Sequence, residues 1–318
     1  MTLSSVSRKK WVQSLRARLA FNALGTVRYH QSVVDTLTKL VLNSTFDEDL
    51  DPLSRDGAPN RLMQKLLREL QATETIFRMI RAPFARGIQP NWLSKSDRRF
   101  KQLNDILTLA YRLIKKMTKG SERNALALQK HVTTIRRHLG CGLSCTTTLK
   151  EIFVDKRKLL ARIEKDLIFQ FMDLLQNEKH PRYIDFLLSI CTAGGAPMHA
   201  IQDMIGSALL EHNTRLLPIC RVSEGNGRIT LEIHVPGQCD ELGADLWIDL
   251  ADFGDQHMQT ENCDYLSHVM QAPFSELDTR ERVVRYFVHC IQLYGKLCFG
   301  RHQGNLKYFL MTPDMPFR

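Results

Sequence analysis

The sequence predicts a mainly α protein, an armadillo-like helical-repeat stack with a small β-hairpin insertion near residues 228–250. Over most of the 318 residues, apolar side chains recur at the three- and four-residue spacing of amphipathic helices. Clusters of Gly, Pro, Asp and Asn separate these segments. One stretch differs, because its apolar residues from Ile229 to Val235 alternate with polar ones, which is typical of a half-exposed strand. Residues 245–250 are the expected partner strand.

Charge divides the chain into a basic part and an acidic part. Residues 1–140 contain 26 Lys and Arg against 11 Asp and Glu, whereas residues 141–318 contain 18 against 23. A basic half indicates an anionic partner. Nucleic acid is one alternative, but the basic pattern interleaved with aromatic residues of an RNA-recognition module is missing. A compact group of cations fits a polyphosphate better, and we expect no nucleic acid to bind.

Turn-forming residues indicate where the helical segments begin and end. An acidic loop with Pro and Gly is expected over residues 43–60, and a second loop follows Pro83 up to Ser94. Gly120 should stop one helix, and Ser121 can cap the next. The segments expected to be helical from their apolar spacing are 1–44, 61–84, 103–114, 198–210 and 280–299.

One predicted helix is central to the function. Asn60 follows Pro59 and is a suitable N-cap for a helix that begins at Arg61. The apolar residues of this helix lie on one side and should face a core. These residues are Leu62, Met63, Leu66, Leu67 and Leu70.

Three cations occupy the other side of the same helix. Arg61, Lys65 and Arg68 are spaced at i, i+4 and i+7, so they fall within roughly 60° of one another. Cations are unfavourable near the positive N-terminal end of a helix dipole, and a bound anion would reverse that effect. Backbone N–H groups with guanidinium and ammonium groups beside them form a phosphate site. The alternative is a solvated basic face, which spacing alone favours.

A resemblance to a known family favours the phosphate site over the solvated basic face. The chain carries Asn-Arg at 60–61, Lys-Leu-Leu-Arg-Glu at 65–69, Ile-Phe at 76–77 and Ala-Pro-Phe at 82–84. This segment resembles the ligand-binding helix of inositol 1,4,5-trisphosphate receptors. Further segments are similar to that family in the same order, so the resemblance extends from about residue 30 to residue 318. They are residues 105–116, 146–162, 181–191, 286–298 and 300–303.

The resemblance implies a domain organisation. Helix pairs of this family, the RIH (ryanodine and inositol trisphosphate receptor homology) family, form an armadillo-like right-handed stack in which each pair buries its apolar face on its neighbours. We expect a basic helical lead-in over residues 1–29, an RIH domain over residues 30–212, and a continuation with the β insertion and further helices over residues 213–318.

The resemblance also implies a set of ligand-binding residues. The three phosphate-contacting cations of the family's helix match Arg61, Lys65 and Arg68. A second ligand-contacting turn of the family, Tyr-Arg-Lys, falls on residues 121–123, where only Arg123 keeps the basic character. The related ryanodine receptors share the fold and are not expected to carry the basic triad. The predicted site for inositol phosphate is therefore Arg61, Lys65, Arg68 and Arg123.

The sequence shows no pattern typical of an enzyme or a metal site. No nucleophile motif, Gly-rich phosphate loop or His-Glu-x-x-His spacing occurs. Cys141, Cys145 and the nearby His138 lack an evident fourth ligand, so buried or surface thiols in the reduced state are expected. The carboxylates of residues 47–51 lack the EF-hand pattern and are expected to form a solvated loop. We expect no enzymatic activity, no metal and no cofactor.

The resemblance implies a role in calcium release. It implies the cytosolic ligand-binding and gating portion of a channel that inositol 1,4,5-trisphosphate opens, at the endoplasmic reticulum or another intracellular calcium store. The implied partners are this ligand and the β-trefoil and pore domains of a homotetrameric parent, which we expect to lie outside this sequence. No apolar run approaches the roughly 18–20 residues that span a bilayer, so we expect no direct membrane insertion by this segment. A helical-repeat interaction scaffold and a ryanodine-receptor-like channel fragment, neither of which would bind inositol phosphate, are the alternatives.

Overall fold

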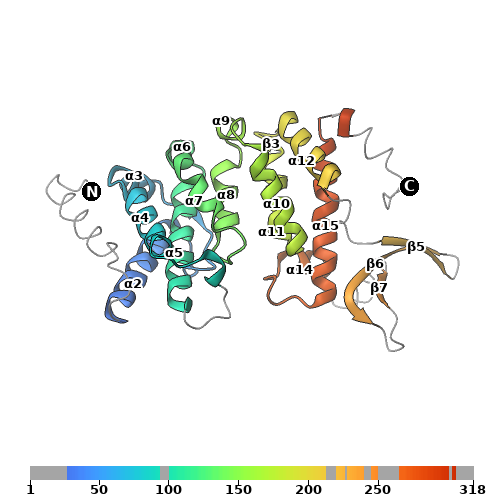
Figure 1. Cartoon of the computed structure of the whole chain (residues 1–318), viewed down its shortest axis with the longest axis horizontal. Helices are drawn as coiled ribbons and strands as arrows, with labels where there is room; N and C mark the ends of the chain where they lie inside the picture. Colours follow the sequence, from blue (N-terminus) through green and yellow to red (C-terminus); the bar gives the residue numbers. More distant parts are fainter. Residues whose placement is uncertain are drawn as a thin grey trace. The chain divides into compact units, whose positions relative to one another are not determined.

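The computed structural model describes residues 27–93, 100–212, 220–225, 228–239, 245–249, 265–300 and 303–305. These residues are mainly helical and include small antiparallel sheets, which confirms the predicted fold class (Figure 1). The chain divides into two compact units, Met1–Ile163 and Glu164–Arg318. The predicted basic lead-in lies outside the described residues up to residue 26.

The first unit is built around α5 (Lys101–Thr118), whose apolar residues are buried at the predicted spacing. It packs against α2 (Val27–Asn43), α4 (Ala72–Ala85) and α8 (Cys145–Phe153). After α5 the chain turns at Gly120, whose φ of +63° is a left-handed conformation that glycine adopts readily. The unit also contains α3 (Arg61–Glu69), η1 (Pro90–Leu93), α6 (Glu122–Leu128), η3 (Gln129–His131), α7 (Val132–Arg136) and α9 (Arg157–Leu160).

Two local predictions in this unit differ from the structure. The loop expected directly after Pro83 begins later, because α4 continues to Ala85. Pro83 has no N–H to donate within the helix, but its carbonyl oxygen still accepts the N–H of Arg86 at 3.1 Å. The helix expected over residues 61–84 is divided into α3 and α4, because Gln71 between them has a left-handed φ of +52°.

The second unit contains α10 (Lys165–Asn177), α11 (Pro181–Ile190), α12 (His199–His212), α14 (Tyr265–Gln271) and α15 (Thr279–Cys298). Both α11 and α12 pack against α15, and α10 packs against α12. The helices predicted over residues 198–210 and 280–299 are therefore confirmed as α12 and α15. Asp278 and Glu281 form a capping box at the start of α15, which satisfies two of the N–H groups exposed at a helix end.

The β insertion is a three-stranded antiparallel sheet in the order β5 (Cys220–Gly225), β6 (Arg228–Cys239) and β7 (Asp245–Asp249). The predicted hairpin is confirmed as β6 and β7, in which Ile233 pairs with Ile248. Strand β5 was not predicted. Val235 and Ile248 pack with Val284 of α15, so the sheet buries its apolar side against a helix. A two-stranded pair, β3 (Thr192–Ala193) and β4 (Ala196–Pro197), precedes α12.

Candidate functional site

Helix α3 begins at the predicted residue. Asn60 has extended backbone angles, φ −76° and ψ 101°, and its side-chain oxygen accepts the N–H of Met63 at 3.2 Å. Asparagine is favoured at this position because it satisfies an N–H group that has no partner within the helix. The short pair of β1 (Thr45–Phe46) and β2 (Ala58–Pro59) leads the chain into this cap.

Polar side chains of α3 contact the C-terminal end of α5. The Nη1 atom of Arg61 donates to the carbonyl oxygens of Lys119 at 3.1 Å and Gly120 at 2.9 Å. The Nε2 atom of Gln64 donates to the carbonyl oxygens of Lys116 and Lys119, both at 2.9 Å. Carbonyl groups at a helix end lack partners within the helix and carry the negative end of its dipole. The positive charge of Arg61 is therefore unfavourable at the N-terminus of its own helix, α3, and favourable beside the C-terminal carbonyl groups of α5.

These contacts orient α3 differently from the sequence prediction. Leu62 was expected to face a core, but its side chain is 81% exposed. Leu67 and Leu70 are buried as predicted, and the polar residue Gln64 is buried with them. Since Gln64 bonds the last carbonyl groups of α5, the buried side of α3 includes a polar residue and Leu62 lies opposite to it.

Arg68 connects α3 to the first turn of α6. Its Nη1 atom donates to the side-chain oxygen of Asn124 at 2.8 Å. Ser121 caps α6 as predicted, since its hydroxyl oxygen accepts the N–H of Asn124 at 3.4 Å. Arg123 is exposed on the same turn. The structure therefore brings Arg61, Arg68 and the turn that carries Arg123 to one junction between α3, α5 and α6.

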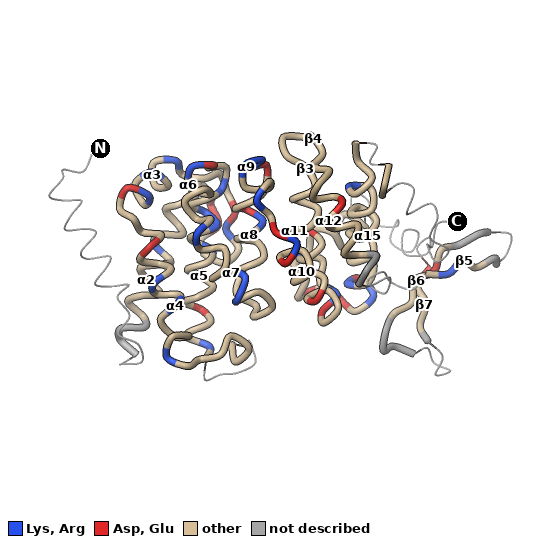
Figure 2. Tube along the Cα trace, turned by 45° about the horizontal axis from the view of Figure 1, so that its top comes forward, with Lys and Arg blue, Asp and Glu red and all other residues tan. Residues whose placement is uncertain are grey.

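Lys65 differs from the other predicted site residues. Its side chain is 65% exposed, and its ammonium group lies 4.0 Å from the carboxylate of Glu69, one turn further along α3. Such an exposed pair within a helix contributes only about 0.3–0.5 kcal/mol. Figure 2 shows the Lys and Arg positions of α3 and α6.

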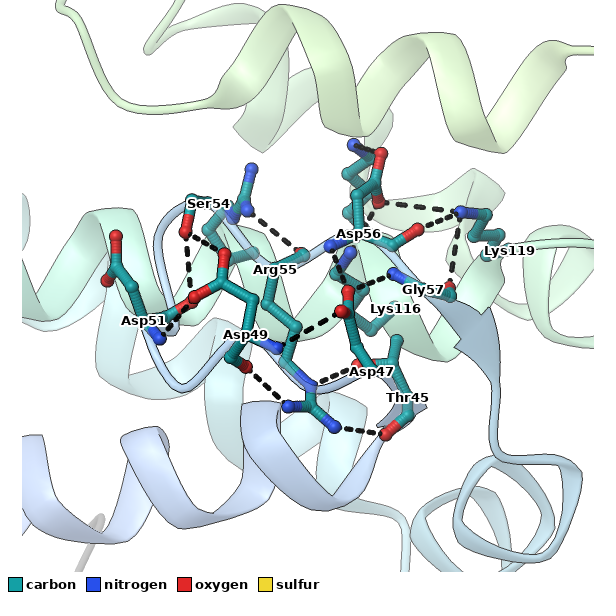
Figure 3. Close-up of polar contacts among 12 residues, drawn as sticks. Thr45, Asp47, Asp49, Asp51, Ser54, Arg55, Asp56, Gly57, Lys116 and Lys119 are labelled. Atoms are coloured by element: carbon teal, nitrogen blue, oxygen red, sulfur yellow. Dashed lines mark hydrogen bonds and ion pairs between the residues drawn. The ribbon is translucent and has the colours of Figure 1, made fainter.

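The acidic loop before α3 is exposed but internally ordered (Figure 3). Arg55 is buried and donates to the backbone and side-chain oxygens of Thr45, both at 2.8 Å. The carboxylate of Asp47 accepts the N–H groups of Asp49, Asp56 and Gly57 at 3.2, 3.0 and 2.7 Å. Hydrogen bonding from the Asp49 N–H is the main cause that lowers the pKa of Asp47. The prediction of a merely solvated loop is therefore incomplete.

Asp56 joins this loop to α5 through three lysines. Its carboxylate forms ion pairs with Lys115 at 3.2 Å, with Lys116, and with Lys119 at 3.5 Å. The side chain of Lys116 is fully buried, whereas that of Asp56 is 51% exposed. Partial burial by itself raises the pKa of Asp56, but the hydrogen bond from Lys116 and the charges of the three lysines lower it to about 2. Sequence reasoning missed this cluster, because its members are about sixty residues apart and only the close spacing of the lysines is visible in the sequence.

The described residues contain no cluster of side chains suited to binding a metal ion. Within them, no three His, Cys, Asp or Glu side chains are grouped so that they could hold a metal ion. None of the cysteines that the structure describes forms a disulfide; they are Cys141, Cys145, Cys191, Cys220, Cys290 and Cys298. In the same described part of the chain, no helix combines the length and apolar character needed to cross a membrane.

Comparison with known protein families shows to which family the chain belongs. The RIH domain matches residues 31–220, which is more than half of the sequence. The chain belongs to the RIH domain family. This match includes α3, α5 and α6, and it confirms the resemblance noted from the sequence motifs.

Of two curated relatives of this RIH domain chain, one is named as an inositol trisphosphate receptor and the other as a receptor-like protein. The chain is 23% identical over 281 residues to inositol 1,4,5-trisphosphate receptor-like protein A of Dictyostelium discoideum, covering 87% of this chain and 7% of that protein. It is 25% identical over 218 residues to the inositol 1,4,5-trisphosphate receptor itr-1 of Caenorhabditis elegans, covering 64% of this chain and 8% of that protein. The chain thus spans less than a tenth of the length of either relative.

Proposed function

We propose that this RIH domain is the cytosolic ligand-binding and gating part of an intracellular calcium release channel that inositol 1,4,5-trisphosphate opens. The names of both relatives support this proposal. A β-trefoil domain and a pore would come from the rest of a homotetrameric parent in the membrane of the endoplasmic reticulum or a similar store. The chain itself would act by binding rather than by catalysis.

The observation that carries the proposal is the junction of α3, α5 and α6. Arg61 and Arg68 each contact this junction through Nη1. An arginine has five N–H donors, so each side chain is oriented by the protein while its other donors can turn to a ligand. Side chains that are already ordered lose less conformational entropy when a ligand binds. We propose that Arg61, Lys65, Arg68 and Arg123 together contact the phosphates.

Calorimetric titration with inositol 1,4,5-trisphosphate tests this proposal. Binding to the chain alone should be weak, because the trefoil side of the cleft is missing. Arg61→Gln, Lys65→Gln, Arg68→Gln and Arg123→Gln should each weaken binding about tenfold or more, since a charge-assisted contact contributes about 1.5–3 kcal/mol. Lys39→Gln, which removes an exposed cation from α2, is the matched control. Equal binding by the parent and all four variants would show that the site assignment is wrong.

One observation favours a second candidate, a helical interaction scaffold that does not bind inositol phosphate. Arg61 and Arg68 already have acceptors within the protein, so both could serve the fold alone. This candidate predicts that Arg61→Gln and Arg68→Gln lower stability while no inositol phosphate binds to any variant. The same titration therefore distinguishes the two functions.

A further inference from the structure

A second set of cations lies on α5 and is separate from the predicted inositol phosphate site. Arg112, Lys115, Lys116 and Lys119 are spaced at i, i+3, i+4 and i+7, so they share one face of the helix. We name these four residues the α5 basic stripe. All four contact the short segment of residues 55–57 in the acidic loop, which is shown in Figure 3.

This contact gives the stripe very little negative charge. Arg112 donates to the carbonyl oxygen of Arg55 at 3.1 Å, and Lys119 donates to the carbonyl oxygens of Asp56 at 2.7 Å and Gly57 at 3.3 Å. Among the described residues, the carboxylate hydrogen-bonded to the stripe is that of Asp56, whereas the charges of Asp51 and Glu151 act on Arg112 and Lys115 from a distance. Four cations are therefore bound by one anionic group and three neutral carbonyl oxygens within the described part of the chain.

The stripe also has unused hydrogen-bonding capacity. The Nε atom of Arg112 is buried and has no hydrogen-bond partner within the described structure. A carboxylate has two oxygens to share among the three ammonium groups, whereas a phosphoryl group offers three oxygens and up to two negative charges. A phosphate would thus match the stripe better than the aspartate that now occupies it.

The geometry allows Asp56 to leave. Its side chain is half exposed and lies on the solvent side of Lys116, which is fully buried. The loop does not depend on Asp56 for its shape, because Arg55 bonds Thr45 and the carboxylate of Asp47 accepts three N–H groups. The Asp56 carboxylate can turn outward while the loop backbone stays in place.

We propose that the α5 basic stripe is a binding site for a soluble anion of the phosphate class, and that Asp56 is an internal competitor that such an anion displaces. The exchange keeps the buried ammonium group of Lys116 paired, which an open site would not. The lysine side chains of the stripe are no more than 30% exposed, so a small soluble anion can reach them more readily than a flat membrane surface. The proposal does not rest on the function of Arg61, Lys65, Arg68 and Arg123.

The test compares Asp56→Asn with Asp105→Asn in thermal unfolding with inorganic pyrophosphate. Asp105 is exposed near the start of α5, so its substitution changes the net charge equally and leaves the stripe intact. All proteins also carry Lys65→Gln and Arg123→Gln, which removes two cations of the inositol phosphate site from the comparison. In buffer without phosphate, Asp56→Asn should melt at a lower temperature than Asp105→Asn, because Lys116 loses its carboxylate. Pyrophosphate should restore that loss at a concentration at least about tenfold lower than the one that first stabilises Asp105→Asn.

Two further results decide the outcome. Adding Lys116→Met to Asp56→Asn should abolish the pyrophosphate response, because methionine fills the buried position without a charge. If Asp56→Asn is unfolded without phosphate, recovery of its helical circular dichroism on adding pyrophosphate supports the proposal, and no recovery overturns it. An equal pyrophosphate response of Asp56→Asn and Asp105→Asn would also overturn it. So would binding of Asp56→Asn to vesicles of phosphatidic acid without any response to pyrophosphate.

Discussion

The two basic faces of the first unit have similar sequences and different environments. On α5, three lysines share the carboxylate of Asp56, so their positive charge is partly neutralised within the protein. On α3, Arg61 and Arg68 contact neutral carbonyl and amide oxygens, and Lys65 is mostly exposed. Neutral acceptors orient a cation without cancelling its charge. The comparison teaches that helical spacing of cations alone does not distinguish a site closed by the fold from one open to a ligand.

The largest loss of stability is expected from a substitution in the acidic loop that contacts the α5 basic stripe. A Cβ atom on Gly57 would lie 2.1 Å from the carbonyl oxygen of Phe46 and 2.7 Å from the Cβ atom of Asp47. Gly57→Ala should therefore lower the free energy of unfolding by about 3 kcal/mol, the upper part of the range for overpacking. Urea unfolding measures this, with Gly295→Ala as control, because a Cβ atom there meets nothing within 4 Å. An unchanged stability for Gly57→Ala would mean that the loop is not fixed as described.

Removing the carboxylate of Asp56 should lower the stability by less. The pKa of Asp56 is lowered from 3.8 to about 2, which without screening by water would be a stabilisation of about 2.5 kcal/mol, at about 1.4 kcal/mol per pKa unit. Its side chain is half exposed and partly screened by water, so Asp56→Asn should lower the free energy of unfolding by about 1–2 kcal/mol. Urea unfolding in phosphate-free buffer tests this, and Asp105→Asn should change stability by no more than about 0.5 kcal/mol.

The same carboxylate predicts a dependence on pH. Because the pKa of Asp56 is lower in the folded protein than its ordinary value of 3.8, its stabilising contribution is fully present above that value. The contribution is lost as the pH falls through about 2. The stability difference between the parent and Asp56→Asn should therefore be largest near neutral pH and vanish below about pH 2. Other carboxyl groups titrate in both proteins and cancel in this difference. A constant difference down to that pH would contradict the ion-pair assignment.

Local signals made much of the fold predictable. The helices, the caps at Asn60 and Ser121, and the turn at Gly120 depend on neighbouring residues, and each was identified from spacing or residue type. The β6–β7 hairpin was equally visible in its alternating pattern. Strand β5 was missed because it pairs only with β6 and lacks a comparable alternating apolar pattern of its own.

The environment of the candidate site could not be predicted in the same way. The motif identified Arg61 and Arg68, but the acceptors that connect them to α5 and α6 lie more than fifty residues away in sequence. Leu62 was placed in the core because the spacing of leucines was the only available guide, whereas contacts of Gln64 with α5 set the orientation of the helix. Asp56 lies in the acidic loop predicted over residues 43–60, but its ion pairs were not predicted, because its lysine partners are distant in sequence.

The effect of Arg61 on stability depends on its contacts with α5. A cation near a helix N-terminus is unfavourable, so on that ground alone the removal of Arg61 would leave folding almost untouched or stabilise it slightly. Its contacts with the carbonyl oxygens of Lys119 and Gly120 now predict that Arg61→Gln lowers the free energy of unfolding by about 1 kcal/mol. Arg61→Lys keeps the charge but loses the planar fork of donors, so it should recover only part of the loss in urea unfolding. A stabilised Arg61→Gln protein would show that these contacts do not matter in solution.

The smallest change in stability is expected at Lys65. This substitution tests most directly whether the basic face of α3 is open to a ligand while that of α5 is neutralised within the protein. The Lys65 side chain is 65% exposed and its nearest carboxylate oxygen, on Glu69, is 4.0 Å away, so Lys65→Gln should change the free energy of unfolding by less than about 0.3 kcal/mol. Lys116→Gln is the matched substitution on α5, where the side chain is fully buried, and it should destabilise clearly more. Inositol trisphosphate titration should give the reverse order, with Lys65→Gln weakening binding about tenfold and Lys116→Gln weakening it less, because Asp56 occupies the α5 basic stripe. A lysine that contributes to binding and not to folding is what an open site requires. If Lys65→Gln affects neither binding nor stability, α3 carries a solvated basic face, and the proposed difference between the two faces fails on the α3 side.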